Sequence, residues 1–213
     1  MQGLGARVDH LVYGVPDLGD VIAEIERLLG VRAVMGGKHT GRGTHNALLS
    51  LGRTSYLEII APDPEQPKPK GPRPFGLDTL REPRLVTWAM AVRDIEGHAQ
   101  DARKAGYDPG AVQQMSRALP DGGELRWKLT LRPDAFTEPV RLVPFLIEWE
   151  PGRHPAQTSP GGCVLLDLEG EHPHPEPVQK ALDALGVSMP VIEAGRPALL
   201  ATIECPRGTV VLS

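Results

Sequence analysis

The chain has 213 residues, of which 40% are apolar and 23% charged, a balance typical of a globular domain with a sizeable core. Its formal net charge of −4 is small, which argues against an extended nucleic-acid interface or attraction to anionic lipid. No apolar run reaches membrane-spanning length, the N-terminus lacks a signal-peptide pattern, and two cysteines are too few for a disulfide framework. We therefore expect a cytoplasmic protein that binds a small molecule, with no nucleic-acid or membrane partner; homodimer formation stays open.

The first unit of the chain begins with residues 7–18, which alternate like a strand and end at a helix-start signal. Residues 17–30 then place apolar side chains at helical spacing and stop at a glycine. Residues 44–51 and 54–61 predict two strands with a short turn between them. The glycine-rich residues 36–43 predict a mobile loop without a phosphate-binding motif.

The same order of elements then recurs. A proline-rich linker is followed by a second strand, helix and pair of strands, predicted at residues 85–92, 94–106, 124–131 and 142–150. A third, partial copy follows, predicted at residues 163–168, 177–186, 198–204 and 209–212. The predicted divisions are a first module at 1–62, a linker at 63–83, a second module at 84–152 and a C-terminal extension at 161–213.

Three side chains stand out because they interrupt apolar strand faces. His10 lies between Val8 and Val12 on a face that otherwise indicates the interior, and Glu58 and Glu148 lie at the centres of the two modules' last strands. A carboxylate at such a position is costly unless it is paired, protonated or bound to a cation. If all three face one cavity, a divalent metal such as Zn, Ni, Mn or Fe would relieve the repulsion. Otherwise one or both glutamates lie on a solvated outer face or pair with Arg126, Lys128 or Arg141.

These features resemble the vicinal oxygen chelate superfamily, which includes glyoxalase I, extradiol dioxygenases and bleomycin-resistance proteins. The resemblance rests on Asp9-His10-Leu11 opening the first module and Leu57-Glu58-Ile59 closing it. Residues 43–48 and 144–149 further resemble a glyoxalase-like branch with a C-terminal extension. The resemblance implies an α+β fold in which paired βαβββ modules form a curved-sheet cup, with a C-terminal βαββ unit added.

The resemblance also implies a metal centre shared by the two modules. His10 would be the first ligand, Glu58 the second and Glu148 the fourth. The third position falls on Thr87, which is not a usual ligand and is better suited to contact the substrate. His45 would complete the site or act, with Glu58 or Glu148, as a catalytic acid or base.

Other polar residues are candidates for substrate binding. Arg126 and Lys128 share one strand face and would hold an anionic or oxygen-rich substrate if that face lines the cup; otherwise they form an ordinary solvated face. His154 follows the Glu148 strand closely enough to fold over the cavity mouth. His39, on the glycine-rich loop, is expected to be solvated.

The first function expected is therefore that of a metal-dependent lyase or isomerase of glyoxalase-like type. It would act on a small oxygen-rich molecule by stabilising enediolate-like charge. A non-catalytic binding protein of the resistance type is the alternative from another class, and a ring-cleaving dioxygenase is the third.

Overall fold

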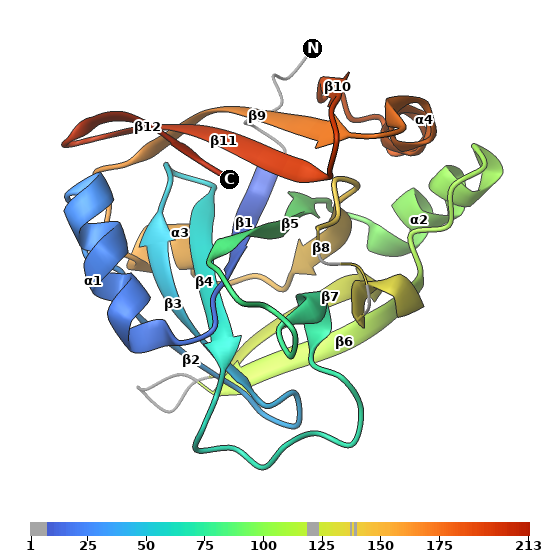
Figure 1. Cartoon of the computed structure of the whole chain (residues 1–213). Coiled ribbons are helices and arrows are strands. Elements are labelled where there is room, and N and C mark those ends of the chain that lie inside the picture. Colours follow the sequence, from blue (N-terminus) through green and yellow to red (C-terminus); the bar gives the residue numbers. More distant parts are fainter. Residues whose placement is uncertain (1–7, 119–123, 137, 139) are drawn as a thin grey trace.

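The computed structural model describes residues 8–118, 124–136, 138 and 140–213. Its main feature is an eight-stranded sheet in the order β2-β3-β4-β1-β5-β8-β7-β6, which curls strongly into a half-barrel (Figure 1). A second sheet, with the order β10-β9-β11-β12, is formed by the C-terminal part of the chain. The α+β cup with a C-terminal unit is thus confirmed.

The two halves of the large sheet repeat one another. In each half the last strand lies beside the first and runs parallel to it, since β4 pairs with β1 and β8 pairs with β5. An antiparallel pairing of β1 with β5 joins the halves at the centre. The first half contains β1 (Val8–Gly14), α1 (Leu18–Leu29), β2 (Val34–His39), β3 (Thr44–Ser50) and β4 (Tyr56–Pro62). The second contains β5 (Arg84–Ala91), α2 (Ile95–Lys104), β6 (Ala111–Ala118), β7 (Glu124–Leu131) and β8 (Phe145–Trp149), with the 3-10 turns η2 (Pro74–Gly76) and η3 (Pro133–Phe136) in its connections.

Helix α1 forms where the sequence predicts it because both of its ends are capped. The side chain of Asp17 accepts a hydrogen bond from the backbone N–H of Gly19. Gly30 ends the helix with a φ of 78°, a left-handed conformation that glycine adopts without strain. The apolar stripe between these caps is buried, and it consists of Leu18, Val21, Ile22, Ile25 and Leu29.

Two strands of the βαβββ modules were not located by the residue pattern. Residues 36–39, expected in a loop, belong to β2, and no residues were assigned to β6. Neither strand has an apolar alternation: β2 carries two glycines and a lysine, and half of the residues of β6 are polar, in no alternating order. Both are instead held by pairing with a neighbouring strand, β2 with β3 and β6 with β7.

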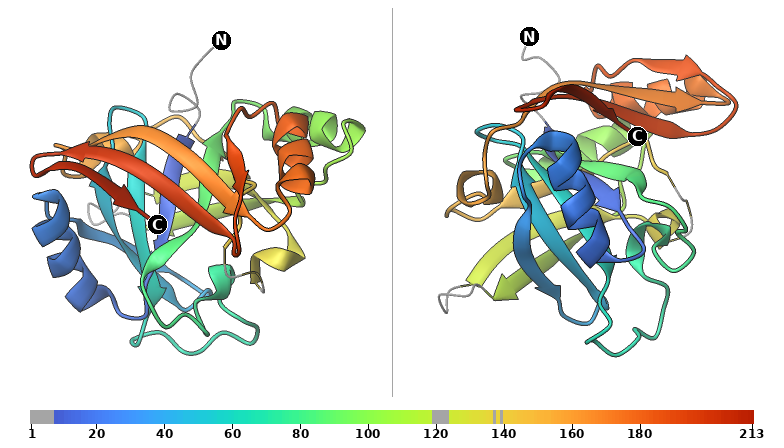
Figure 2. Two further views of the ribbon diagram at one scale, coloured as in Figure 1. Left: turned by 45° about the horizontal axis from the view of Figure 1, so that its top comes forward. Right: turned by 60° about the vertical axis from the view of Figure 1, so that its left-hand side comes forward.

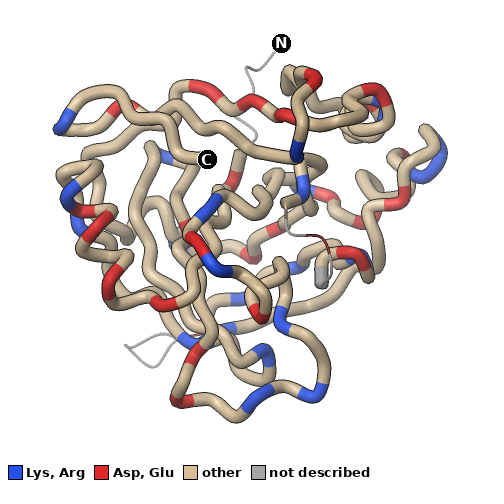
Figure 3. Tube along the Cα trace, in the orientation of Figure 1, with Lys and Arg blue, Asp and Glu red and all other residues tan. Residues whose placement is uncertain are grey.

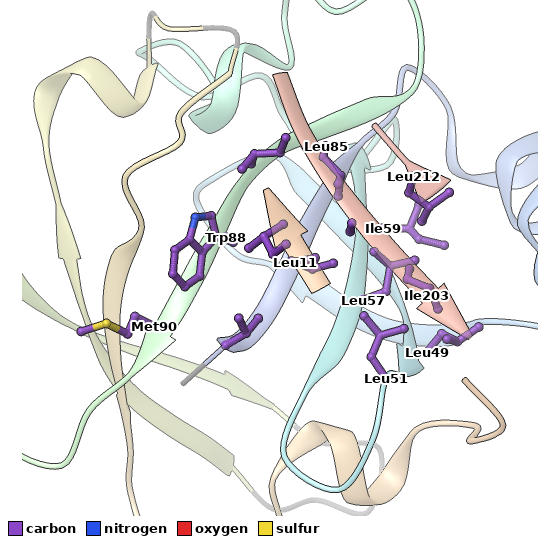
Figure 4. Packing of buried hydrophobic residues seen from close by; sticks show 14 of the residues in the cluster. Leu11, Leu49, Leu51, Leu57, Ile59, Leu85, Trp88, Met90, Ile203 and Leu212 are labelled. Carbon is purple, nitrogen blue, oxygen red and sulfur yellow. The ribbon is translucent and has the colours of Figure 1, made fainter. Parts of the chain in front are cut away.

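The C-terminal unit packs across the face of the sheet opposite to the cup (Figure 2). The short helix α3 (Pro155–Thr158) precedes this unit and lies on the cup side, where Ala156 packs with Leu48 and Tyr56. The elements of the C-terminal unit are β9 (Val164–His172), α4 (Pro175–Ala184), β10 (Val191–Glu193), β11 (Ala198–Cys205) and β12 (Gly208–Leu212). Leu11 of β1 and Leu57 of β4 meet Ile203 and Leu212 in this layer (Figure 4), and all four side chains are less than 5% exposed. The large sheet therefore has a dry face and a cup face, and residues that alternate along β1 or β4 are divided between them.

Acidic and basic residues are interspersed over the chain (Figure 3), in keeping with its small net charge. Among the helices described, none is long and apolar enough to cross a lipid bilayer.

Candidate active site

The cup face of the large sheet lines a cavity of about 110 Å³. One end of the cavity is polar and is formed by His10, His39, Asn46, Tyr56 and Glu58. The walls are mostly apolar, and their largest side chains are Phe75, Trp127, Phe145 and Trp149. A concave apolar pocket with a few convergent polar groups is the usual form of a small-molecule site.

Strand register brings the polar residues together. β1 and β4 are parallel neighbours in which His10 lies opposite Tyr56. Glu58, two residues beyond Tyr56, points to the same face of β4. Asn46, on β3, is paired with Ile60 and faces the cavity as well.

A β-bulge places Asp9 beside His10. In the pairing of β1 with β5, Val8 lies opposite Met90 but His10 lies opposite Ala89, so that Asp9 is an extra residue. The carboxylate consequently reaches the imidazole, with 2.7 Å between Oδ1 of Asp9 and Nδ1 of His10. Strict alternation would have turned these two side chains to opposite faces of the strand.

Asp9 is a buried acceptor for three ring N–H groups. Besides His10, the indole N–H of Trp149 (2.9 Å) and Nε2 of His154 (3.0 Å) donate to its Oδ2. Burial raises the pKa of Asp9, but the hydrogen bonds from His10 and His154 outweigh it, so the pKa lies below the usual 3.8. Because an ionised carboxylate can only accept, Nδ1 of His10 must carry a proton.

The other ring nitrogen of His10 faces Glu58. Nε2 lies 3.7 Å from Oε2 of the carboxylate, too far for a direct hydrogen bond. The imidazole is held between the ring of Tyr56, stacked at 4.7 Å, and the ring of Phe145, at 5.5 Å. Glu58 is only 8% exposed, and its Oε1 accepts a hydrogen bond from the amide of Asn46 at 2.5 Å.

His39 and Tyr56 complete the polar end. Nε2 of His39 lies 3.6 Å from Oε1 of Glu58, while its Nδ1 is 2.9 Å from the hydroxyl of Thr44. Burial lowers the pKa of His39, and the neighbouring Glu58 only partly offsets it, so the ring is neutral at pH 7. Burial raises the pKa of Tyr56 well above its usual value, so its phenol keeps its proton.

The lowered pKa of His39 predicts that acid destabilises the fold. The unfolded chain binds this proton more readily than the folded one, so the free energy of unfolding should fall as the pH drops below about 6.5. The variant His39→Gln should show a weaker dependence. Urea unfolding of both proteins between pH 7.5 and 5.5 measures the effect above the range in which Asp9 titrates. Parallel curves for the two proteins would contradict the prediction.

Comparison with known proteins agrees with this fold. The sequence model of a family described as a glyoxalase-like domain matches residues 8–186. The chain belongs to this glyoxalase-like family. It is therefore a member of the vicinal oxygen chelate superfamily, as the resemblance of its motifs predicted. No curated protein matches the chain.

Several solved structures are similar in fold to this glyoxalase-like protein. A hypothetical protein from Staphylococcus aureus has a TM-score of 0.63 at 16% identity, covering 96% of this chain and 83% of its own. Methylmalonyl-CoA epimerase from Mycobacterium tuberculosis has a TM-score of 0.45 at 24% identity, covering 71% and 93%. A Streptomyces coelicolor methylmalonyl-CoA epimerase variant has a TM-score of 0.42 at 18% identity, covering 67% and 96%. The first similarity shows the fold over nearly the whole chain, and none of the three indicates the reaction.

The two glutamates expected to converge are separated by the sheet. In β8 the side chains of Phe145, Ile147 and Trp149 line the cavity, so Glu148 points to the opposite face. There its Oε2 accepts a hydrogen bond from the backbone N–H of Ile95, at the start of α2. The prediction that Glu148 shares a metal or catalytic site with Glu58 is therefore wrong.

His45, Arg126 and Lys128 also point away from the cup. The cavity is lined by their strand neighbours, and His45 lies instead 3.9 Å from a carboxylate oxygen of Asp63. Arg126 pairs with Glu124, and Lys128 pairs with Glu96, both at or near the protein surface. Arg126 and Lys128 thus form the solvated strand face that was their alternative in the sequence.

Thr87 and His154 lie near the site but do not line the cavity. Thr87 is 1% exposed and pairs with Val12, next to a register shift in the pairing of β5. His154 lies behind Asp9 and supports it. The residues that sequence reasoning missed are Asp9, Asn46, His39, Arg42 and Arg117. The position of Asp9 could not be predicted because the bulge interrupts the alternation of β1. The positions of His39 and Arg117 could not be predicted because the pattern did not locate strands β2 and β6.

The donor groups do not fit the metal centre that the resemblance implies. Of the expected positions His10, Glu58, Thr87 and Glu148, only the first two come together, and no three His, Cys, Asp or Glu side chains in the described part of the chain could hold a metal ion. His39 approaches Glu58, but the amide nitrogen of Asn46 lies between them, 2.5 Å from Glu58 and 3.3 Å from His39. Its N–H hydrogens oppose a cation at that point.

Proposed function

We propose that this glyoxalase-like domain is an isomerase or lyase that moves a proton at a carbon next to a carbonyl group of a small molecule. Glu58 is the base, and His10 is the acid that faces it. The observation that carries this proposal is the 3.7 Å gap between Nε2 of His10 and Oε2 of Glu58 at the polar end of the cavity. A gap longer than a hydrogen bond leaves each atom available to a bound ligand.

The hydrogen bonds around the pair give the two side chains different roles. Asn46 donates to Oε1 of Glu58, which leaves Oε2 to accept a proton from carbon. Asp9 holds Nδ1–H of His10 and stabilises the ring when Nε2 also carries a proton. In that form Nε2–H donates to the carbonyl oxygen and stabilises the negative charge that develops on it. Return of the proton from Glu58 to the same or a neighbouring carbon completes an isomerisation.

A resident metal is not part of this proposal. His10 and Glu58 would supply only two protein ligands to a divalent cation and would leave most of its coordination shell open. Catalytic zinc sites typically have three protein ligands. The same count argues against a ring-cleaving dioxygenase, which uses two histidines and one carboxylate. We therefore assign the charge stabilisation to His10.

Hydrogen–deuterium exchange tests the proposal directly. The protein is incubated in D2O with a panel of small 2-oxo acids, 2-hydroxy ketones and acyl esters, and loss of the α C–H signal is followed by NMR. We expect catalysed exchange in at least one compound, at a rate unchanged by a chelator. Exchange that is lost on chelation and restored by added metal would contradict the assignment to side chains.

A binding protein without turnover is the second candidate. It is favoured by the walls of the cavity, which are mostly apolar and aromatic and contact a ligand without acting on it. Ligand binding without exchange in any member of the panel would support this alternative and overturn the first.

A further inference from the structure

Two arginines line the same cavity without an ion-pair partner among the described residues. Arg42 and Arg117 both belong to the cavity wall, and neither lies within salt-bridge distance of a carboxylate among the residues described. Arg42 donates to the side-chain oxygen of Gln113 at 3.1 Å, a neutral acceptor. By contrast, Arg126 on the outer face of β7 is paired with Glu124. A guanidinium in a mostly apolar cavity is a ready partner for an anion.

The position of Arg117 is built into the strands around it. A side chain at Gly36 of β2 would lie 3.0 Å from its Nη1, and one at Gly37 would lie 2.8 Å from its Cδ. Arg117 therefore lies in a notch in β2 where Gly36 and Gly37 have no side chains.

An unpartnered acceptor lies at the same notch. Oδ1 of Asn46 is buried and has no hydrogen-bond partner among the described residues. The same Cβ built at Gly36 would lie 2.4 Å from it. A buried polar atom without a partner is uncommon and indicates a missing donor, such as a hydroxyl group of a ligand.

The charge and shape of the cavity point to the rest of the ligand. Of its charged lining residues, two are cations, Arg42 and Arg117, and one is an anion, Glu58. The rings of Trp127 and Trp149 lie 5.2 Å apart, and those of Phe75 and Phe145 lie 6.2 Å apart. Such walls suit an aromatic or similarly flat apolar group.

We infer that the ligand is a small organic acid whose carboxylate is held by Arg42 and Arg117 and whose apolar, preferably aromatic, body lies against the aromatic wall. This inference rests on the proposed function in that it names the substrate class of the same site. It places the carboxylate of the ligand in the same cavity as the His10–Glu58 pair. Charged hydrogen bonds of this kind give the carboxylate its selectivity over neutral compounds.

A pair of matched ligands tests the inference by calorimetry. 3-Phenylpropanoate and 3-phenylpropan-1-ol have the same body and differ in the carboxylate. In the wild type the acid should bind at least about 10-fold more tightly than the alcohol. Arg117→Gln and Arg42→Gln should each weaken binding of the acid by about 10- to 100-fold and leave the alcohol within about twofold.

The control variant is Arg126→Gln, which removes an arginine from the outer face of the neighbouring strand and should change neither affinity. Arg117→Lys, which keeps the charge but loses the fork-shaped donor, should give an intermediate loss and guards against misfolding of the glutamine variant. Equal affinity for acid and alcohol overturns the inference. So does the absence of binding by both, repeated with octanoate and 1-octanol.

The outcome is separable from that of the proposed function, since binding needs no turnover. If the acid binds through the arginines and no compound exchanges its α hydrogen, the inference stands and the acid–base proposal fails. If neutral carbonyl compounds exchange and the arginine variants change neither binding nor rate, the acid–base proposal stands and the inference fails.

Discussion

The variant Asp9→Asn is expected to lower the free energy of unfolding by about 2–4 kcal/mol, because one buried carboxylate accepts hydrogen bonds from three rings. An asparagine has the same size but offers one oxygen and one NH2 group. At least one of the N–H groups of His10, Trp149 and His154 would then face another donor. Urea unfolding at pH 7.5 measures the loss.

The same substitution should also reduce catalysed exchange by about 10²-fold or more, because a neutral asparagine does not stabilise the doubly protonated ring whose Nε2–H donates to the carbonyl oxygen. The control is Asp167→Asn, an exposed aspartate on β9 that should change stability by less than about 0.5 kcal/mol. Equal stability of Asp9→Asn and the control would show that the three-ring cluster contributes little.

The second large effect is expected for Glu58→Gln. A glutamine retains the acceptor for Asn46 but cannot take a proton from carbon, so exchange should fall by about 10²- to 10⁴-fold. Stability should be unchanged or slightly higher, since a buried charge is removed. Exchange rates by NMR and urea unfolding separate the two effects.

Glu148→Gln is the matched control for this variant. Its carboxylate lies across the sheet and accepts from the first backbone N–H of α2, so the expected cost is at most about 1 kcal/mol of stability. Exchange should stay within about threefold of the wild type. Equal losses of exchange in the two variants would refute the assignment of Glu58 as the base.

Much of the fold follows from local pattern. The caps and apolar stripe of α1 are all present in the sequence, and the duplicated order of elements predicts the paired halves. His10 and Glu58 were placed correctly in the cup because β1 and β4 separate a dry face from a cavity face.

The remaining site residues could not be placed by pattern for physical reasons. β8 is apolar on both faces, since Leu146 packs in the core and Ile147 lines the cup, so alternation alone could not show which face carries Glu148. Asp9 was missed because a bulge resets the alternation within one residue. β2 and β6 were missed because strands that line a polar site lack the apolar signal on which strand prediction depends.

The two halves of the large sheet contribute different parts of the cavity, and this bears on how the ligands of such a protein diversify. Every titratable group at the polar end of the cavity comes from the first half, while Arg117 and most of the aromatic wall come from the second. Substitutions along β6 and β7 can therefore reshape what is recognised without disturbing the pair that transfers the proton, whereas on β8 the rings of Phe145 and Trp149 support His10 and Asp9. Related proteins with a shared reaction and different ligands would be expected to vary mainly in that second half.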